Sequence, residues 1–128
     1  MEVAYLGGES YAVAARGHAL LTDQPTTTGG EDTAMGPVEL LVTSLSSCVI
    51  FCAGRYRARH GLNRDGLHVT AEFGLAADRP ARVGKIQLKN PGARGVPPRR
   101  RTALLAVASH CTAHNTLRQA PGIAIELT

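Results

Sequence analysis

The sequence of 128 residues contains few aromatic side chains: no Trp, two Phe and three Tyr. Many proteins that bind nucleic acids stack bases on aromatic rings, so this scarcity argues against such a partner, although the net charge is +4. It also means that Ala, Leu and Val must supply most of the buried area. We therefore expect a homodimer to provide the burial that a single chain lacks.

Long apolar runs are also missing from the sequence. No stretch approaches the roughly 18 apolar residues that a membrane span needs. Residues 1–5, Met-Glu-Val-Ala-Tyr, lack the basic and then apolar order of a signal peptide. Hydrophobic residues make up 44% of the chain and charged residues 19%, a balance typical of folded proteins. We expect one cytoplasmic domain, residues 1–128, with neither a membrane nor a nucleic-acid partner.

The three cysteines, Cys48, Cys52 and Cys111, do not form an even set. An odd number in a chain expected to be cytoplasmic does not fit a disulfide framework. Reactive thiols, metal ligands and small core residues remain as explanations.

Alternating and turn-forming segments predict several strands. Residues 11–23 mix β-forming residues with a glycine break and follow the Gly7-Gly8 turn signal, which predicts strands joined by hairpins. Residues 25–36 have no periodic pattern and predict a surface loop. Segments 67–73, 83–89 and 123–127 alternate apolar and polar residues, which predicts three further strands.

Two segments have helical patterns. In residues 37–60 a first-turn proline precedes apolar residues at spacings of three and four, and Gly61 follows as the expected cap. This segment predicts a long, central and buried helix. A second helix is predicted over residues 99–110, after Pro97-Pro98. The order of strands, long helix, strands, helix and strand predicts an α+β fold.

Two of the cysteines could meet in such a fold. Cys48 lies inside the first predicted helix and Cys111 at the end of the second, so a crossing of the helices would bring the thiols together. Two thiols in contact suit peroxide reduction, in which one attacks the peroxide and the other resolves the product. The attacking thiol must be a thiolate, which requires a cation or hydrogen-bond donors nearby; the candidate cations are Arg16, Arg55 and Arg57.

Other interpretations of these residues remain open. Cys48 and Cys52, one helical turn apart on an apolar face, would also serve as small core residues. Cys48 and Cys52 could also bind a metal together with the His and Cys side chains of segment 110–114, which are His110, Cys111 and His114. Structural zinc sites, however, usually place cysteine pairs on a loop. A hydrolase or acyl transferase would need a base for its cysteine, and the candidates are His60, His110 and His114.

Four segments resemble the OsmC/Ohr family: residues 23–25, 29–32, 36–48 and 110–117. The most specific feature is the pair of cysteine segments in the right order. The first is a helix started by proline with a cysteine inside it; the second is a helix that ends in a cysteine followed by His-Asn and Leu. The resemblance implies an OsmC-like fold, in which curved antiparallel sheets enclose a long central helix. It also implies an intertwined homodimer with two sites at the subunit interface.

The resemblance implies a thiol-dependent peroxidase that reduces organic hydroperoxides. Cys48 matches the attacking cysteine, which becomes a sulfenic acid, and Cys111 matches the cysteine that condenses with it to a disulfide. A dithiol such as lipoyl, or a small thiol, would reopen the disulfide. We expect no cofactor and no bound metal. The alternative is a non-catalytic OsmC-like protein that senses redox state or binds a small molecule.

Two family residues that support the attacking cysteine are replaced here. The family's peroxidases use an Arg after a Gly-Gly pair and a Glu ten residues before the cysteine, where this sequence has Glu9 and Val38. Arg16 and Glu39 are the candidates to support Cys48 in their place.

Overall fold

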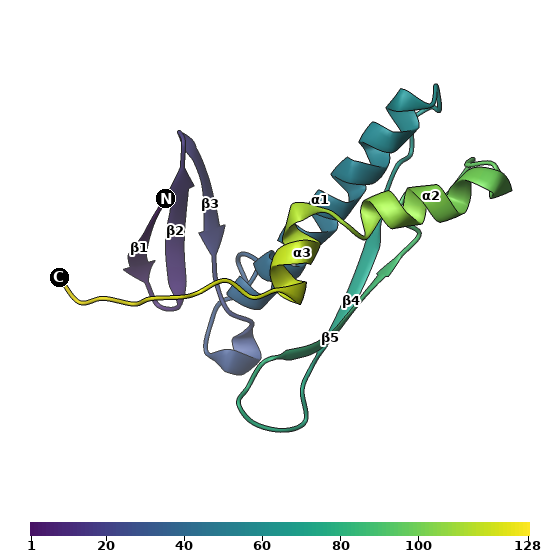
Figure 1. The fold of residues 1–128 in the computed structure, drawn as a ribbon. Helices are drawn as coiled ribbons and strands as arrows, with labels where there is room; N and C mark the ends of the chain where they lie inside the picture. The colour runs from purple at the N-terminus through teal and green to yellow at the C-terminus, as the bar shows by residue number, and fades with distance from the viewer. The chain divides into compact units, whose positions relative to one another are not determined.

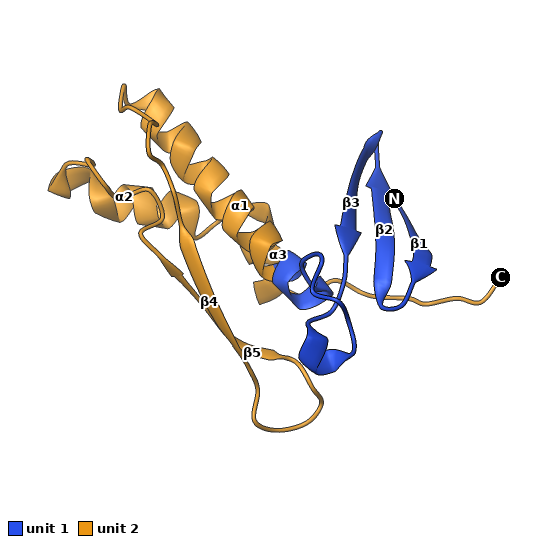
Figure 2. Cartoon of the chain, turned by 180° about the vertical axis from the view of Figure 1, so that it is seen from behind, with its two compact units in different colours: residues 1–41 blue, residues 42–128 orange.

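The computed structural model describes residues 1–128, which divide into two compact units, residues 1–41 and 42–128 (Figure 2). Unit 1 contains a three-stranded antiparallel sheet of β1 (Glu2–Gly7), β2 (Ser10–Ala15) and β3 (His18–Thr22), in that order (Figure 1). Arg16 and Gly17 form the turn between β2 and β3, and both have a positive φ, as a tight hairpin turn requires. The hairpins predicted from the sequence are confirmed.

A buried carboxylate orders the loop that follows β3. Asp23 accepts hydrogen bonds from the backbone N–H of Gln24 (2.8 Å), Glu31 (3.2 Å) and Thr33 (3.0 Å), and from the Thr33 hydroxyl (2.8 Å). These donors, the Thr33 N–H above all, lower the pKa of Asp23 to about 2 from 3.8. The segment predicted as a loop is therefore held in one conformation, and it includes a short 3₁₀ helix, η1 (Thr26–Thr28).

Helix α1 (Pro37–Arg59) begins at the end of unit 1 and continues through the start of unit 2. The Glu39 carboxylate accepts a hydrogen bond from the Gly36 N–H (2.7 Å), as in one half of a capping box, and Gly61 follows the helix with φ of 65°. The predicted bounds and cap are confirmed. Seven helix residues are buried: Val42, Leu45, Val49, Ala53, Gly54, Tyr56 and Arg57.

The expectation of a buried helix is confirmed for only part of the α1 surface. In the single chain Phe51 is 60% exposed and Leu41 is 44% exposed. The expectation that no segment could span a membrane also needs correction. By length and composition α1 passes that test, with a mean hydropathy of 1.6 over 18 residues; a core helix passes the same test.

Unit 2 adds two strands and two helices to α1. Strands β4 (Thr70–Leu75) and β5 (Val83–Lys89) pair antiparallel, and helices α2 (Pro98–Ala108) and α3 (Thr112–Arg118) follow. One cluster of buried residues joins α1 to the end of α2 and to residue 111: Leu45, Val49, Ala108 and Cys111. A second cluster joins the later part of α1 to the start of α2: Ala53, Tyr56, Val96 and Leu104. The mixed α+β fold with antiparallel sheets is confirmed.

Three predicted elements differ from the observed ones. Strand β4 begins at Thr70 and not at Leu67, because its partner β5 ends at Lys89, where Asn90 turns the chain with φ of 55°. The second helix ends at Ala108, two residues early, and helix α3 was not predicted. Residues 123–127 form no strand; they are exposed and have no backbone hydrogen-bond partner in this chain.

The hydrogen bonds of Asp23 predict a stability change at acid pH. Its pKa is lowered by folding, so its contribution is present above its unfolded pKa of about 4 and is lost as the pH falls towards 2. We expect Asp23→Asn to lower the urea midpoint at pH 7, since an amide offers one acceptor oxygen where the carboxylate has two. The difference from wild type should shrink near pH 2. Glu31→Gln, in the same loop, is the control that should match wild type at pH 7; an equal loss in both variants would contradict the role of Asp23.

The close packing of α1 at Gly54 predicts a second stability change. A Cβ atom at this position would lie 3.2 Å from Leu67 Cδ2. We expect Gly54→Leu to reduce the free energy of unfolding by about 1–3 kcal/mol, as overpacking does, despite the higher helix propensity of Leu. Urea denaturation followed by circular dichroism measures this. Ala58→Leu, on the exposed side of the same helix, should cost little, and the packing argument fails if the two variants are equally stable.

Candidate functional site

Two elements bring the cysteines together. Cys48 and Cys52 lie one turn apart on α1 and are half-buried, whereas Cys111 lies in the short connection between α2 and α3 and is buried. Both α1 thiols pack against the cluster that contains Cys111. All three cysteines are free thiols. The predicted meeting of Cys48 and Cys111 is therefore present in the structure, and Cys52 lies beside them.

The backbone fixes the position of the Cys111 sulfur. Residue 111 is the N-cap of α3 with extended backbone angles, φ of −70° and ψ of 158°, and its Sγ accepts a hydrogen bond from the His114 N–H at 3.4 Å. Ala108, one turn earlier in the chain, packs in the same buried cluster. The end of α2 and the start of α3 thus hold this thiol against α1.

The Cys111 thiol is kept protonated. Burial raises the pKa of Cys111 above 9.0, and this effect outweighs the His114 N–H, which lowers it. A hydrogen bond with the Cys48 side chain raises the pKa further, as do the charges that Cys48 and Cys52 carry when ionised. The three thiols thus lie within one cluster, and the neighbouring thiols favour the protonated form of Cys111.

Two arginines of α1 that were candidate cations have other contacts in the structure. The Arg55 guanidinium lies over the Phe51 ring, 5.7 Å from its centroid. Arg57 is buried and donates to three backbone carbonyls, those of Asn63, Gly92 and Arg94. These two sequence candidates therefore have other partners.

The two remaining supporting candidates belong to unit 1. Arg16 is exposed in the turn between β2 and β3, and Glu39 caps the first turn of α1. Their roles towards Cys48 stay predictions.

The histidines named from the sequence differ in their surroundings. The His110 ring contacts the Ala106 carbonyl (2.6 Å). The His60 ring contacts Arg100 (2.8 Å) and lies against the Tyr56 ring in a tilted arrangement. His114 is different, since its Nδ1 atom is buried and has no hydrogen-bond partner. No group of three or more His, Cys, Asp or Glu side chains is placed to hold a metal ion.

An apolar cavity of about 210 Å³ lies beside the cysteine cluster. His114 lines it together with side chains of α1, β5 and α2: Leu45, Val49, Ile86, Leu88, Leu105 and Ala108. Leu45, Val49 and Ala108 belong to both the cavity wall and the cluster around Cys111. The sequence does not predict this cavity, because its walls come from elements far apart in the chain. The only local sequence signal for a role of His114 is its spacing of three residues from Cys111.

Comparison with known proteins gives a family and two similar folds. A family described as OsmC-like protein matches residues 29–126. A Psychrobacter arcticus 273-4 protein named for osmotic stress induction and a detoxification response superposes with a TM-score of 0.74 at 24% identity, covering 90% of this chain and 85% of that one. A Legionella pneumophila protein named as the organic hydroperoxide resistance protein OsmC gives a TM-score of 0.58 at 21% identity, covering 91% and 92%. No curated protein matches.

The contact between two thiols predicts that they titrate together. We expect Cys48→Ala to lower the pKa of Cys111, because it removes both the hydrogen bond and the charge that raise it. The pH dependence of the iodoacetamide reaction, followed by peptide mass spectrometry, measures the pKa of Cys111 in each variant. Cys52→Ala removes only a charge and should lower the pKa less. An unchanged Cys111 pKa in Cys48→Ala would show that the thiols do not interact.

Proposed function

Because the chain belongs to the OsmC-like protein family, we propose that it is a thiol-dependent peroxidase that reduces organic hydroperoxides. Cys48 attacks the peroxide and Cys111 resolves the product. The observation that supports this proposal most directly is the packing of the Cys48 side chain against the buried cluster that contains Cys111. In this proposal Cys111 is the resolving cysteine, because a buried thiol with a raised pKa is a poor attacking group, and the half-buried Cys48 attacks.

The proposed reaction cycle has three balanced steps. The Cys48 thiolate attacks the outer oxygen of the hydroperoxide; the O–O bond breaks, and the alkoxide takes a proton and leaves as an alcohol. Cys48 is now a sulfenic acid, and the Cys111 sulfur displaces its hydroxyl to form a disulfide and water. A dithiol such as lipoyl, or two molecules of a small thiol, then reduces the disulfide by thiol exchange.

The surroundings of the cysteines suit an apolar peroxide. The cavity beside them is lined mainly by Leu, Val and Ile side chains, which favour an alkyl chain over water. Arg16 and Glu39 are proposed to support Cys48, in place of the residues that Glu9 and Val38 replace. No cofactor or metal is needed for these steps, and the proposed location is the cytoplasm.

A homodimer belongs to the same proposal. Large apolar side chains are exposed on the sheet of unit 1, on α1 and on the C-terminal segment; examples are Tyr5 at 65%, Phe51 at 60% and Ile125 at 92%. Monomers rarely expose so much apolar surface. An intertwined dimer, with curved sheets enclosing the long helices, would cover these side chains and would give segment 123–127 a strand to pair with.

One observation favours a second function. Within unit 2 the arginines near the cysteines on α1 bind other groups, so no cation of that unit is shown to stabilise a Cys48 thiolate. A thiol without such a cation reacts slowly with peroxides. The alternative is therefore a non-catalytic protein that senses redox state or binds a small apolar molecule at the same cavity.

One equivalent of cumene hydroperoxide added to the reduced protein tests the proposal. We expect a Cys48–Cys111 disulfide, with Cys52 free, in the peptide mass map. With a dithiol present, Cys48→Ser should reduce turnover more than about a hundredfold. Cys111→Ser should stop turnover at a sulfenic or overoxidised Cys48, and Cys52→Ser should remain active. Thiols that stay unreacted would reject the peroxidase in favour of the binding or sensing protein.

A further inference from the structure

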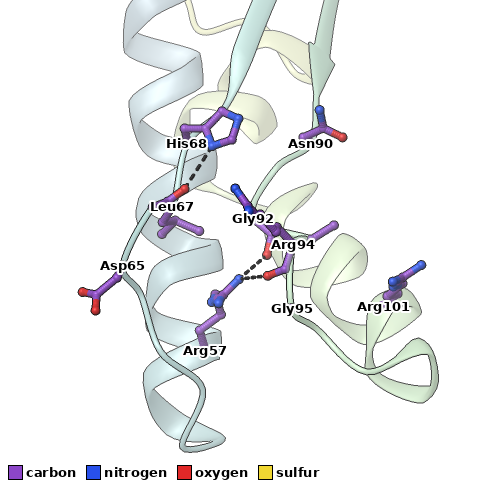
Figure 3. A pocket seen from close by; sticks show the side chains of 11 residues that line it. Arg57, Asp65, Leu67, His68, Asn90, Gly92, Arg94, Gly95 and Arg101 are labelled. Carbon is purple, nitrogen blue, oxygen red and sulfur yellow. Dashed lines mark hydrogen bonds between the residues drawn. The ribbon is translucent and has the colours of Figure 1, made fainter.

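A second cavity, of about 570 Å³, opens at the carboxyl-terminal end of α1 (Figure 3). Arg57 of α1 and Arg101 of α2 line it, together with residues 65–68, 90 and 92–95 of the two loops that flank β4 and β5. Its volume falls in the range of about 300–1,000 Å³ that holds small organic ligands. All of its lining residues belong to unit 2, so the cavity is formed within one compact unit.

Arg57 lies at the inner end of this cavity and is only 6% exposed. Its Nε atom donates to the Asn63 carbonyl (2.6 Å), and its Nη1 atom donates to the carbonyls of Gly92 (2.8 Å) and Arg94 (2.6 Å). Figure 3 shows the two Nη1 bonds. Its Nη2 atom makes no hydrogen bond within the protein and therefore keeps two donors free.

The buried guanidinium has no acidic partner. The two ion pairs of the chain are Arg82–Asp78 and Lys89–Glu72, both on the surface. Asp65 is the one acid that lines the cavity; its carboxylate accepts a bond from the Asn63 side chain (2.9 Å), and Figure 3 shows it turned away from Arg57. A buried charge without a counter-ion is costly, and carbonyl dipoles compensate it only in part.

Further positive charges lie around the same space. Arg94 and Arg101 are exposed and line the cavity. Arg101 uses its Nε atom to bind the Val96 carbonyl (3.1 Å), which leaves its two Nη groups free. Guanidinium groups bind carboxylate and phosphate oxygens through paired hydrogen bonds. Three arginines line the cavity, and the carboxylate of the one acid that lines it, Asp65, already accepts a hydrogen bond. The cavity therefore favours anions over cations.

Two glycines shape the backbone of the loop that holds Arg57. Gly92 has φ of 77°, and a Cβ atom there would lie 2.7 Å from Leu67 Cδ1 and 3.2 Å from Ala53 Cβ. Gly95 has φ of 72°, and a Cβ atom there would lie 3.9 Å from Arg57 Nη2. The glycines let the loop pack closely on α1 while its carbonyls hold Arg57.

We propose that this cavity is a binding site for a small organic anion, whose carboxylate or phosphate group is held by Arg57 Nη2, Arg94 and Arg101. The anion supplies the counter-charge that Arg57 lacks, and the apolar side chains of Leu67 and Ala93 contact the rest of the molecule. Arg57 is nine residues from Cys48 along α1, a rise of about 13.5 Å, so the site is separate from the thiols. The proposal is therefore independent of the peroxidase chemistry.

Calorimetric titration of the full chain with pyrophosphate and with citrate, at physiological ionic strength, tests the site. We expect saturable binding of at least one probe and a rise in the thermal midpoint at saturation. Pyrophosphate binding more tightly indicates a phosphate-bearing ligand, and citrate binding more tightly indicates a carboxylate. Arg101→Gln and Arg94→Gln should each weaken binding by about tenfold, as loss of a charge-assisted bond does.

Arg99→Gln is the matched control, because Arg99 is exposed on the same turn of α2 as Arg101 but does not line the cavity. It should change the affinity less than about twofold, the effect expected of a screened surface charge. Absence of saturable binding for both probes overturns the proposal. Equal weakening by Arg99→Gln and Arg101→Gln also overturns it, since binding would then follow total charge and not this cavity.

Discussion

The packing of the connection between α2 and α3 on α1 is the contact on which the proposed chemistry depends. Ala108 and Cys111 are almost fully buried against Leu45 and Val49, and Cys48 and Cys52 pack against this same cluster. The small side chains at positions 108 and 111 allow the chain to approach α1 closely. A thiol at the end of one helix therefore lies beside a thiol inside another.

The local environment makes these two thiols chemically different. Cys111 is desolvated, which disfavours its thiolate, and its hydrogen bond with Cys48 favours its protonated form. Cys48 is only half-buried. The asymmetry comes from burial and hydrogen bonding. The proposed attacking role belongs to the more accessible cysteine.

Arg57 links the far end of α1 to the loops that flank the hairpin of β4 and β5. In the sequence it is one of several arginines near the end of a helix, where a cation favours the helix dipole. In the structure it is buried, and it holds residues 63, 92 and 94 through their carbonyls. Neighbouring arginines on one helix thus have unlike roles, because Arg55 is exposed over Phe51 while Arg57 faces the interior.

The sequence alone determined the elements whose signals are local. Proline at the first turn, apolar residues at helical spacing and Gly61 after the last turn gave the bounds of α1, and paired turn residues gave the hairpins. The candidate pair Cys48 and Cys111 also came from the sequence, through the order of two helical segments and the family resemblance.

Only the tertiary structure decided which partners these residues have. No local pattern encodes burial or the contacts between residues far apart in the chain. These decide the burial of Cys111 and its interaction with Cys48, the unpartnered Nδ1 of His114 and the anchoring of Arg57. In segment 123–127 a local pattern alone was not enough to form a strand. Its alternation is a correct local signal for a strand, but a strand needs a neighbour for its backbone groups, and a single chain offers none.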